Sequence, residues 1–139
     1  MRFTPEQAIQ ADKFCTNTLV SHLGIRFLVD EEGRFCATMP VESRTHQPMG
    51  LLHGGATAAL AESLGSMGSA LLIDLSREGV VGIELNANHL KSVREGVVKA
   101  TGTLLHKGRT THVWDIRVTG PGGELCALCR LTNLIILQK

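Results

Sequence analysis

The sequence predicts an α+β fold in which one antiparallel sheet of five to six strands wraps around a single long central helix. Three observations support this prediction. A long apolar segment at residues 53–74 has helical character, four β-rich segments follow it, and a short helix and two strands precede it. The 139 residues have the size of one ordinary domain, and no repeat or linker divides them. We therefore expect residues 1–139 to form a single domain.

The chain is expected to begin with a short N-terminal helix. In the segment TPEQ, Thr4 fits the cap position, proline follows at the first helical position, and Gln7 completes a capping box. This helix is predicted to run to about Phe14. Residues 19–23 are predicted to add one more turn of helix before Gly24.

Strands account for most of the remaining chain. Residues 25–29 and 35–39 are predicted strands joined by the turn DEEG, with Pro40 ending the second, and residues 41–50 are expected to form a polar loop. After Gly79 the chain is rich in β-branched residues and is punctuated by glycine. The four strands predicted there cover residues 80–90, 97–105, 111–119 and 125–137.

The predicted central helix carries one charged residue, Glu62, before Asp74. Its other residues are mostly small or apolar, so the helix is expected to be buried and closely packed. Ser66 and Ser69 lie four and seven positions after Glu62, so the three polar side chains share one face. Because burying an unpaired carboxylate costs several kcal/mol, we interpret Glu62 as a general base or nucleophile in a shielded cleft. A structural carboxylate bound to a serine or a backbone group is the alternative.

The start of this helix is a second candidate site. The first backbone N–H groups of a helix have no partner within it and carry the positive end of its dipole. Gly54 and Gly55 leave these groups uncovered, so we expect an oxyanion-binding site there. Gly54 and Glu62 are about 12 Å apart along the axis at ~1.5 Å per residue. The two can meet at one carbonyl only if two antiparallel subunits share the site.

Composition and spacing exclude several classes of function. The net charge of +1 gives no general attraction for nucleic acid or for an anionic membrane. There is no signal peptide and no apolar run approaching the ~20 residues that span a bilayer, so a cytoplasmic location is expected. No His, Cys and Asp residues have the spacing of metal ligands. We interpret Cys126 and Cys129 as apolar strand residues on opposite faces, in preference to a redox pair or half of a zinc site.

Together these features resemble the hotdog-fold thioesterases of the 4-hydroxybenzoyl-CoA type that use a catalytic glutamate. The resemblance rests on RTHQPMGLLHGGA at residues 44–56, AES at 61–63 followed by Gly65 and Ser66, VVGIELNANH at 80–89 and HKGR at 106–109. It covers residues 23–137 and is closest to the members that serve the enterobactin and menaquinone pathways. It implies hydrolysis of an acyl- or aroyl-thioester of coenzyme A or of an acyl-carrier protein. It also implies a homodimer at minimum, extended to a homotetramer as a dimer of dimers, and no cofactor, since coenzyme A is part of the substrate.

The resemblance also implies roles for individual residues. Glu62 matches the nucleophile or general base, and Gly54 matches the backbone donor to the thioester oxygen. Gln47 and His53 match side chains near that carbonyl, and Ser66 matches a residue that holds substrate or water. The positions matched to substrate contacts, including those to pantetheine and nucleotide, are Gly82, His89, Leu90, Lys91, Ser92, His106, Lys107, Gly108, Arg109, Thr110 and Thr111.

Two other functions stay open on the sequence alone. A hotdog acyl-thioester dehydratase or hydratase needs a His–Asp or His–Glu pair, and His53 stands next to Gly54. A non-catalytic acyl-CoA-binding module needs no carboxylate in its cleft, so Glu62 argues against it. The sequence determines neither the acyl group nor the choice between water activation and a covalent anhydride route.

Overall fold

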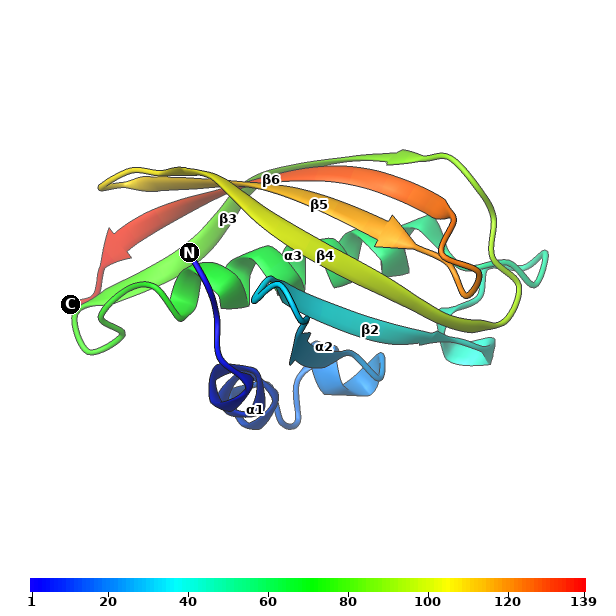
Figure 1. Cartoon of the computed structure of the whole chain (residues 1–139), viewed down its shortest axis with the longest axis horizontal. Coiled ribbons are helices and arrows are strands. Elements are labelled where there is room, and N and C mark those ends of the chain that lie inside the picture. Colours follow the sequence, from blue (N-terminus) through cyan, green and yellow to red (C-terminus); the bar gives the residue numbers. More distant parts are fainter.

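The computed structural model describes all residues from 1 to 139 as one antiparallel sheet curled over a central helix (Figure 1). The strand order is β1-β2-β4-β5-β6-β3, and every neighbouring pair is antiparallel. The predicted α+β hotdog fold is therefore confirmed. The elements are α1 (Pro5–Phe14), α2 (Leu19–His22), β1 (Arg26–Val29), β2 (Phe35–Val41), a 3₁₀ turn (Ser43–Thr45), α3 (Gly54–Ala70), β3 (Glu78–His89), β4 (Gly96–Lys107), β5 (Thr111–Thr119) and β6 (Leu125–Leu137).

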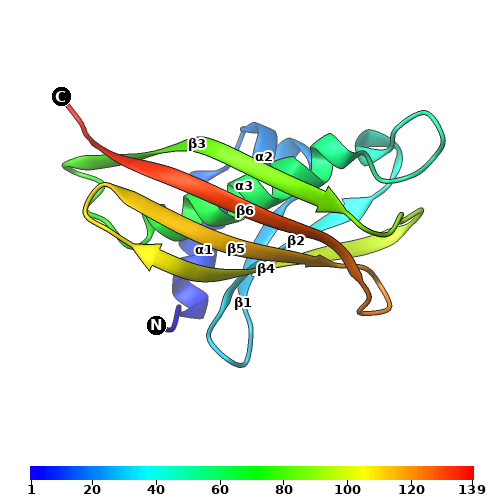
Figure 2. The same cartoon turned by 90° about the horizontal axis from the view of Figure 1, so that it is seen from above.

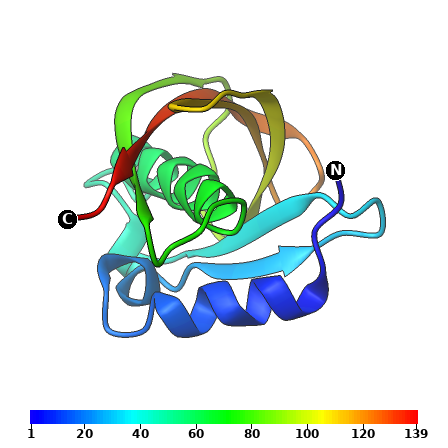
Figure 3. The same ribbon diagram turned by 90° about the vertical axis from the view of Figure 1, so that its left-hand side faces the viewer.

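The sheet surrounds α3, whereas α1 lies outside it. Figure 3 shows the strands curling around α3 and α1 packed below β1 and β2. The capping box predicted for α1 is present, because the Gln7 N–H donates to Thr4 Oγ1 at 3.3 Å and the Thr4 N–H donates to Gln7 Oε1 at 2.9 Å. None of the helices is long and apolar enough to cross a lipid bilayer.

Glycines let α3 pack closely against the sheet, as predicted from its small residues. A Cβ atom on Gly65 would lie 2.5 Å from Leu131 Cδ2, and one on Gly68 would lie 2.7 Å from the Trp114 ring. Such separations are too short for packed carbon atoms, so any larger residue would push α3 away from the sheet. The largest fully buried apolar side chains are Trp114, Phe35, Met39, Leu60, Leu64, Ile116 and Leu131.

Two predicted boundaries were wrong. Pro40 does not end its strand, because it pairs with Val97 of β4. On its other side β1 reaches only as far as Thr38, so no neighbouring strand requires the N–H that proline lacks. The central helix ends at Ala70 and not near Asp74. The Asp74 carboxylate instead accepts hydrogen bonds from the Ser76 N–H at 3.0 Å and hydroxyl at 2.7 Å, which stabilises a turn.

The two edges of the sheet differ in length. β1 has four residues, whereas β3 has twelve and pairs only with β6. Val81 and Ile83 on β3 are 45% and 55% exposed. A register shift between Gly82 and Glu84 adds a bulge near the middle of this strand. A long edge strand with exposed apolar side chains offers unpaired backbone groups to another strand, so β3 is the edge suited to a partner.

Candidate active site

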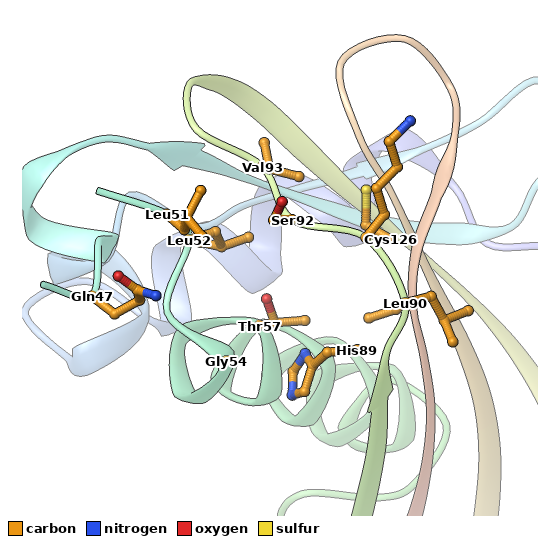
Figure 4. Close-up of a pocket in the computed structure, with 12 residues that line it drawn as sticks. Gln47, Leu51, Leu52, Gly54, Thr57, His89, Leu90, Ser92, Val93 and Cys126 are labelled. Carbon is orange, nitrogen blue, oxygen red and sulfur yellow. The ribbon is translucent and has the colours of Figure 1, made fainter. Parts of the chain in front are cut away.

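A cavity of about 400 Å³ opens at the start of α3 (Figure 4). The loop before α3, its first turn, the end of β3 and the start of β6 form its walls, and its size suits a small ligand. Six of the predicted site residues line it, namely Gln47, Gly54, His89, Leu90, Lys91 and Ser92. The sequence analysis missed the other six, Leu51, Leu52, Thr57, Val93, Cys126 and Ala127, of which Leu52 and Val93 adjoin predicted positions.

The loop that carries Gln47 is held by its own hydrogen bonds. The Gln47 N–H donates to the Leu51 carbonyl at 2.8 Å, and Gln47 Oε1 accepts from the Met49 N–H. The His46 ring joins this loop to the β3–β4 loop through the Arg94 carbonyl at 2.8 Å. Because Oε1 is occupied, the Nε2 group of Gln47 is the donor that is left for the cavity. Figure 4 shows this side chain across the cavity mouth from His89 and Leu90.

The Gly54 N–H is the first-turn donor of α3 that has no partner in the chain. The Gly55 N–H donates to His53 Nδ1 at 2.7 Å, and the next two N–H groups donate to the His53 carbonyl at 3.0 and 3.2 Å. The prediction that Gly55 is also uncovered was wrong, because the His53 side chain caps it. A Cβ atom on Gly54 would lie 3.1 Å from His89 Nε2, so the imidazole packs closely against the glycine that carries the free N–H group.

Glu62 lies two turns further along α3, outside this cavity. In the single chain it is exposed, contrary to the predicted burial, and it takes part in none of the ion pairs. Its carboxylate instead lies over Gly82, where a Cβ atom would be 2.5 Å from Oε1. Since β3 is an edge strand, the Glu62 face of α3 reaches the open side of the sheet. One chain therefore does not bring Glu62 and Gly54 to the same cavity.

The family model described as the thioesterase superfamily matches residues 49–127. The chain belongs to the thioesterase superfamily. The proofreading thioesterase EntH of Klebsiella pneumoniae is 48% identical over 120 residues, which cover 86% of this chain and 87% of that protein.

Solved structures give the same result for fold and activity. A variant of the thioesterase PA1618 from Pseudomonas aeruginosa matches with a TM-score of 0.91 and 48% identity over 94% of each chain. The thioesterase HI1161 from Haemophilus influenzae matches with a TM-score of 0.88 and 42% identity, covering 99% of this chain and 93% of that one. The chain is thus a thioester hydrolase, which confirms the predicted activity over the dehydratase and the binding module.

The polar stripe predicted on α3 follows a row of residues in the thioesterase sheet. Gly82, Asn133 and His112 are register partners across β3, β6 and β5. Glu62 lies over the first of these, the Ser66 hydroxyl lies 3.4 Å from Asn133 Oδ1, and Ser69 bonds to Asn133 and His112. The prediction that these side chains share one face is confirmed.

His112 is a buried structural residue. Its side chain is 1% exposed, and its Nδ1 atom lies 2.9 Å from Ser69 Oγ. Burial lowers the pKa of this imidazole, and the positive charges of Lys107 and His106 lower the same pKa further.

This burial predicts acid sensitivity of folding. Below an ordinary histidine pKa of ~6.5 the unfolded chain binds a proton that the folded chain does not, so stability is lost as the pH falls through that value and levels off below the folded pKa. We expect the free energy of unfolding to drop less in His112→Asn than in the wild type between about pH 7.5 and about pH 5. Denaturant titration of both proteins measures this, with the exposed His22→Asn as a control. Identical pH dependence in all three proteins would contradict the prediction.

The predicted segment from His106 to Thr111 does not join the cavity of its own chain. It forms the hairpin between β4 and β5, which lies at the opposite end of the molecule from the start of α3 (Figure 1 and Figure 2). His106, Lys107, Arg109 and Thr110 are exposed there. The basic side chains of this tip are therefore available to solvent or to a second subunit.

Cys126 and Cys129 are both buried free thiols. The expectation that they point to opposite faces was wrong, because a register shift in the β5–β6 pairing at Val118 and Thr119 adds one residue to β6 beside Cys126. Burial raises the pKa of Cys129 to about 11 and also raises the pKa of Cys126. Thiols of this kind are unreactive, which fits their interpretation as apolar residues.

Proposed function

We propose that this thioesterase hydrolyses an acyl- or aroyl-thioester of coenzyme A, or of an acyl-carrier protein, at a site shared by two antiparallel subunits. The proposal rests on the distance, within one chain, between the two halves of the site, the Gly54 N–H and the Glu62 carboxylate. The free Gly54 N–H lines the cavity, whereas Glu62 lies outside it and faces the open edge of the sheet. A second copy of the chain supplies the missing half to each cavity.

The β3 edge supports the pairing of subunits that this site needs. A two-fold axis beside β3 joins the two sheets edge to edge and runs the two α3 helices antiparallel beneath them. Such pairing covers the exposed side chains of Val81 and Ile83. It also moves the His106–Thr111 hairpin of one subunit toward the cavity end of its partner, because the two lie at opposite ends of one chain.

In the proposed mechanism the thioester oxygen accepts hydrogen bonds from the Gly54 N–H and from Gln47 Nε2. Glu62 of the partner subunit takes a proton from water as the water oxygen bonds to the carbonyl carbon. The tetrahedral oxyanion then collapses, the C–S bond breaks, and the proton passes to the departing sulfur. Alternatively the carboxylate attacks directly and water hydrolyses the resulting anhydride. His53 fixes the first turn through its cap, and Ser66 holds the water.

The remaining predicted residues are proposed to bind the carrier of the acyl group. His89, Leu90 and Ser92 line the cavity where a pantetheine arm enters, and Lys91 offers a cation to a phosphate. The hairpin of the partner subunit, His106, Lys107, Gly108, Arg109, Thr110 and Thr111, is proposed to contact the nucleotide. Gly82 contributes by leaving room for the Glu62 carboxylate.

The oligomeric state and the cellular location are also proposed. We propose a dimer of dimers, supported by a second set of exposed apolar side chains, Ile9, Phe14 and Leu19, on α1 and α2. A cytoplasmic location is proposed because all four cysteines are free, as in reducing compartments. No cofactor takes part, since coenzyme A is the thiol of the substrate.

Subunit complementation tests the shared site. Gly54→Val closes the cavity against His89, and Glu62→Gln removes the carboxylate, so each variant alone is expected to be inactive. In a heterodimer of the two, one site has both native residues and the other has neither. Co-expression with two different tags isolates this heterodimer, and release of free thiol from aroyl-, phenylacyl- and fatty acyl-CoA measures its activity.

Recovered hydrolysis in the heterodimer supports the shared site, and the best substrate in the panel identifies the acyl class. A heterodimer of Glu62→Gln with Glu62→Ala is the matched control and is expected to stay inactive. An inactive Gly54→Val and Glu62→Gln heterodimer, shown by sedimentation to be assembled, would contradict the proposal.

A further inference from the structure

A buried polar cluster that the proposed mechanism does not use lies between α3 and the sheet. Its members are Ser69, His112, Trp114 and Asn133, each no more than 1% exposed. Buried polar groups cost free energy unless they are hydrogen-bonded, and no buried side-chain nitrogen or oxygen in the chain lacks a partner. The cluster therefore forms a closed network whose hydrogen-bond directions can be assigned.

The hydrogen-bond directions follow from groups that can only donate or only accept a hydrogen bond. The Trp114 Nε1–H group only donates, so Ser69 Oγ accepts it at 2.9 Å. The Gly65 carbonyl only accepts, so the atom 3.1 Å from it is Asn133 Nδ2, which also donates to Ser69 Oγ at 3.0 Å. With both lone pairs of Ser69 occupied, its hydrogen goes to His112 Nδ1 at 2.9 Å. That nitrogen carries no proton, and the lowered pKa of His112 is consistent with this.

The orientation of the Asn133 amide then fixes the Ser66 hydroxyl. Asn133 Oδ1, an acceptor only, lies 3.4 Å from Ser66 Oγ, so Ser66 donates its hydrogen inward. The hydroxyl keeps free lone pairs and no free hydrogen. Because Ser66 lies one turn after Glu62 on the same face, its acceptor side is close to the carboxylate.

From this chain of donors we infer that Asn133 is a positioning residue, which acts through Ser66 to orient the water used in hydrolysis. A water between Glu62 and Ser66 donates one hydrogen to each, and its lone pair is then directed toward the substrate carbon. Without Asn133 the Ser66 hydroxyl is free to donate to the Glu62 carboxylate and competes with that water. The inference rests on the role of Glu62 proposed above.

A double-mutant cycle tests this inference. Asn133→Ser and Ser66→Ala are each expected to lower kcat by ~10-fold with little change in KM, the order expected for one misdirected hydrogen bond. The double variant is expected to be no slower than the slower single variant, because both changes remove the same function. Steady-state thiol release is the measurement, with thermal unfolding recorded for every variant.

Ser69→Ala is the matched control. It opens the buried cluster but leaves Asn133 bonded to Ser66 and to Gly65, so it is expected to lower the unfolding temperature and to leave kcat within ~2-fold. Losses that multiply in the double variant would show that Asn133 acts independently of Ser66 and would overturn the inference. Should Asn133→Ser not fold, unchanged kcat in Ser66→Ala overturns it equally. Residual hydrolysis by Glu62→Gln bears on the proposed base and not on this step.

Discussion

Replacement of Glu62 by glutamine is expected to lower kcat for thioester hydrolysis by ~10²–10⁴-fold, the usual contribution of a general base. The amide has the size of the carboxylate but neither takes the proton of water nor attacks the carbonyl. Because Glu62 is exposed in the single chain and forms no ion pair, the unfolding temperature is expected to change little. Glu62→Asp, whose side chain is one methylene shorter, is expected to have a kcat between those of the wild type and Glu62→Gln. Steady-state kinetics with the best CoA thioester measure all three proteins.

Glu6→Gln supplies the matched control for the loss of one negative charge. Glu6 is exposed in the first turn of α1, away from the cavity and from β3. Its replacement is expected to leave kcat unchanged. Activity of Glu62→Gln within a few-fold of the wild type, in a folded dimer, would show that another group performs the base or nucleophile step.

Local signals made most of the fold predictable. The α1 capping box and the glycines between strands act through neighbouring residues, so the sequence carries them directly. The element boundaries that were predicted wrongly depend on which segments pack beside them in the fold. Pro40 stays in β2 because β1 is too short to reach it, and the length of β1 is a property of the assembled sheet. The inward packing of Gly65 and Gly68 was foreseeable only as a preference for small residues.

The candidate site was predictable in part for a similar reason. Gln47, Gly54 and His89 belong to two of the motifs on which the family resemblance rests, and the cavity brings them together. The exposure of Glu62 follows from its place at the β3 edge, which the sequence does not specify. Asn133 had a weak signal, as a polar residue two positions from Leu131 and hence on the buried face of β6. Its partners on α3 and β5 come from distant segments, so their contacts appear only in the fold.

The second large expected effect concerns Gly82, which leaves space for the Glu62 carboxylate. A Cβ atom on Gly82 would lie 2.5 Å from Glu62 Oε1, while the nearest atom of another residue, Leu131 Cδ1, would be at an ordinary 3.6 Å. Gly82→Ala is therefore expected to displace the carboxylate and leave the core intact. A misplacement of about 1 Å at a catalytic group costs up to ~10²-fold in rate, so kcat is expected to fall by ~10–100-fold. The unfolding temperature is expected to hold or rise, because alanine reduces the entropy of the unfolded chain.

Gly79→Ala separates this effect from a general weakening of the edge strand. Gly79 also lies on β3, and a Cβ atom there would meet Gln138 and Ile136 only at 3.5 Å or beyond. The same chemical change on the same strand thus spares the carboxylate, and full activity is expected. Equal losses in both variants, or loss of the dimer in sedimentation, would assign the effect to subunit pairing. A loss confined to Gly82→Ala would show that the space left by glycine at position 82 lets Glu62 take its reactive position.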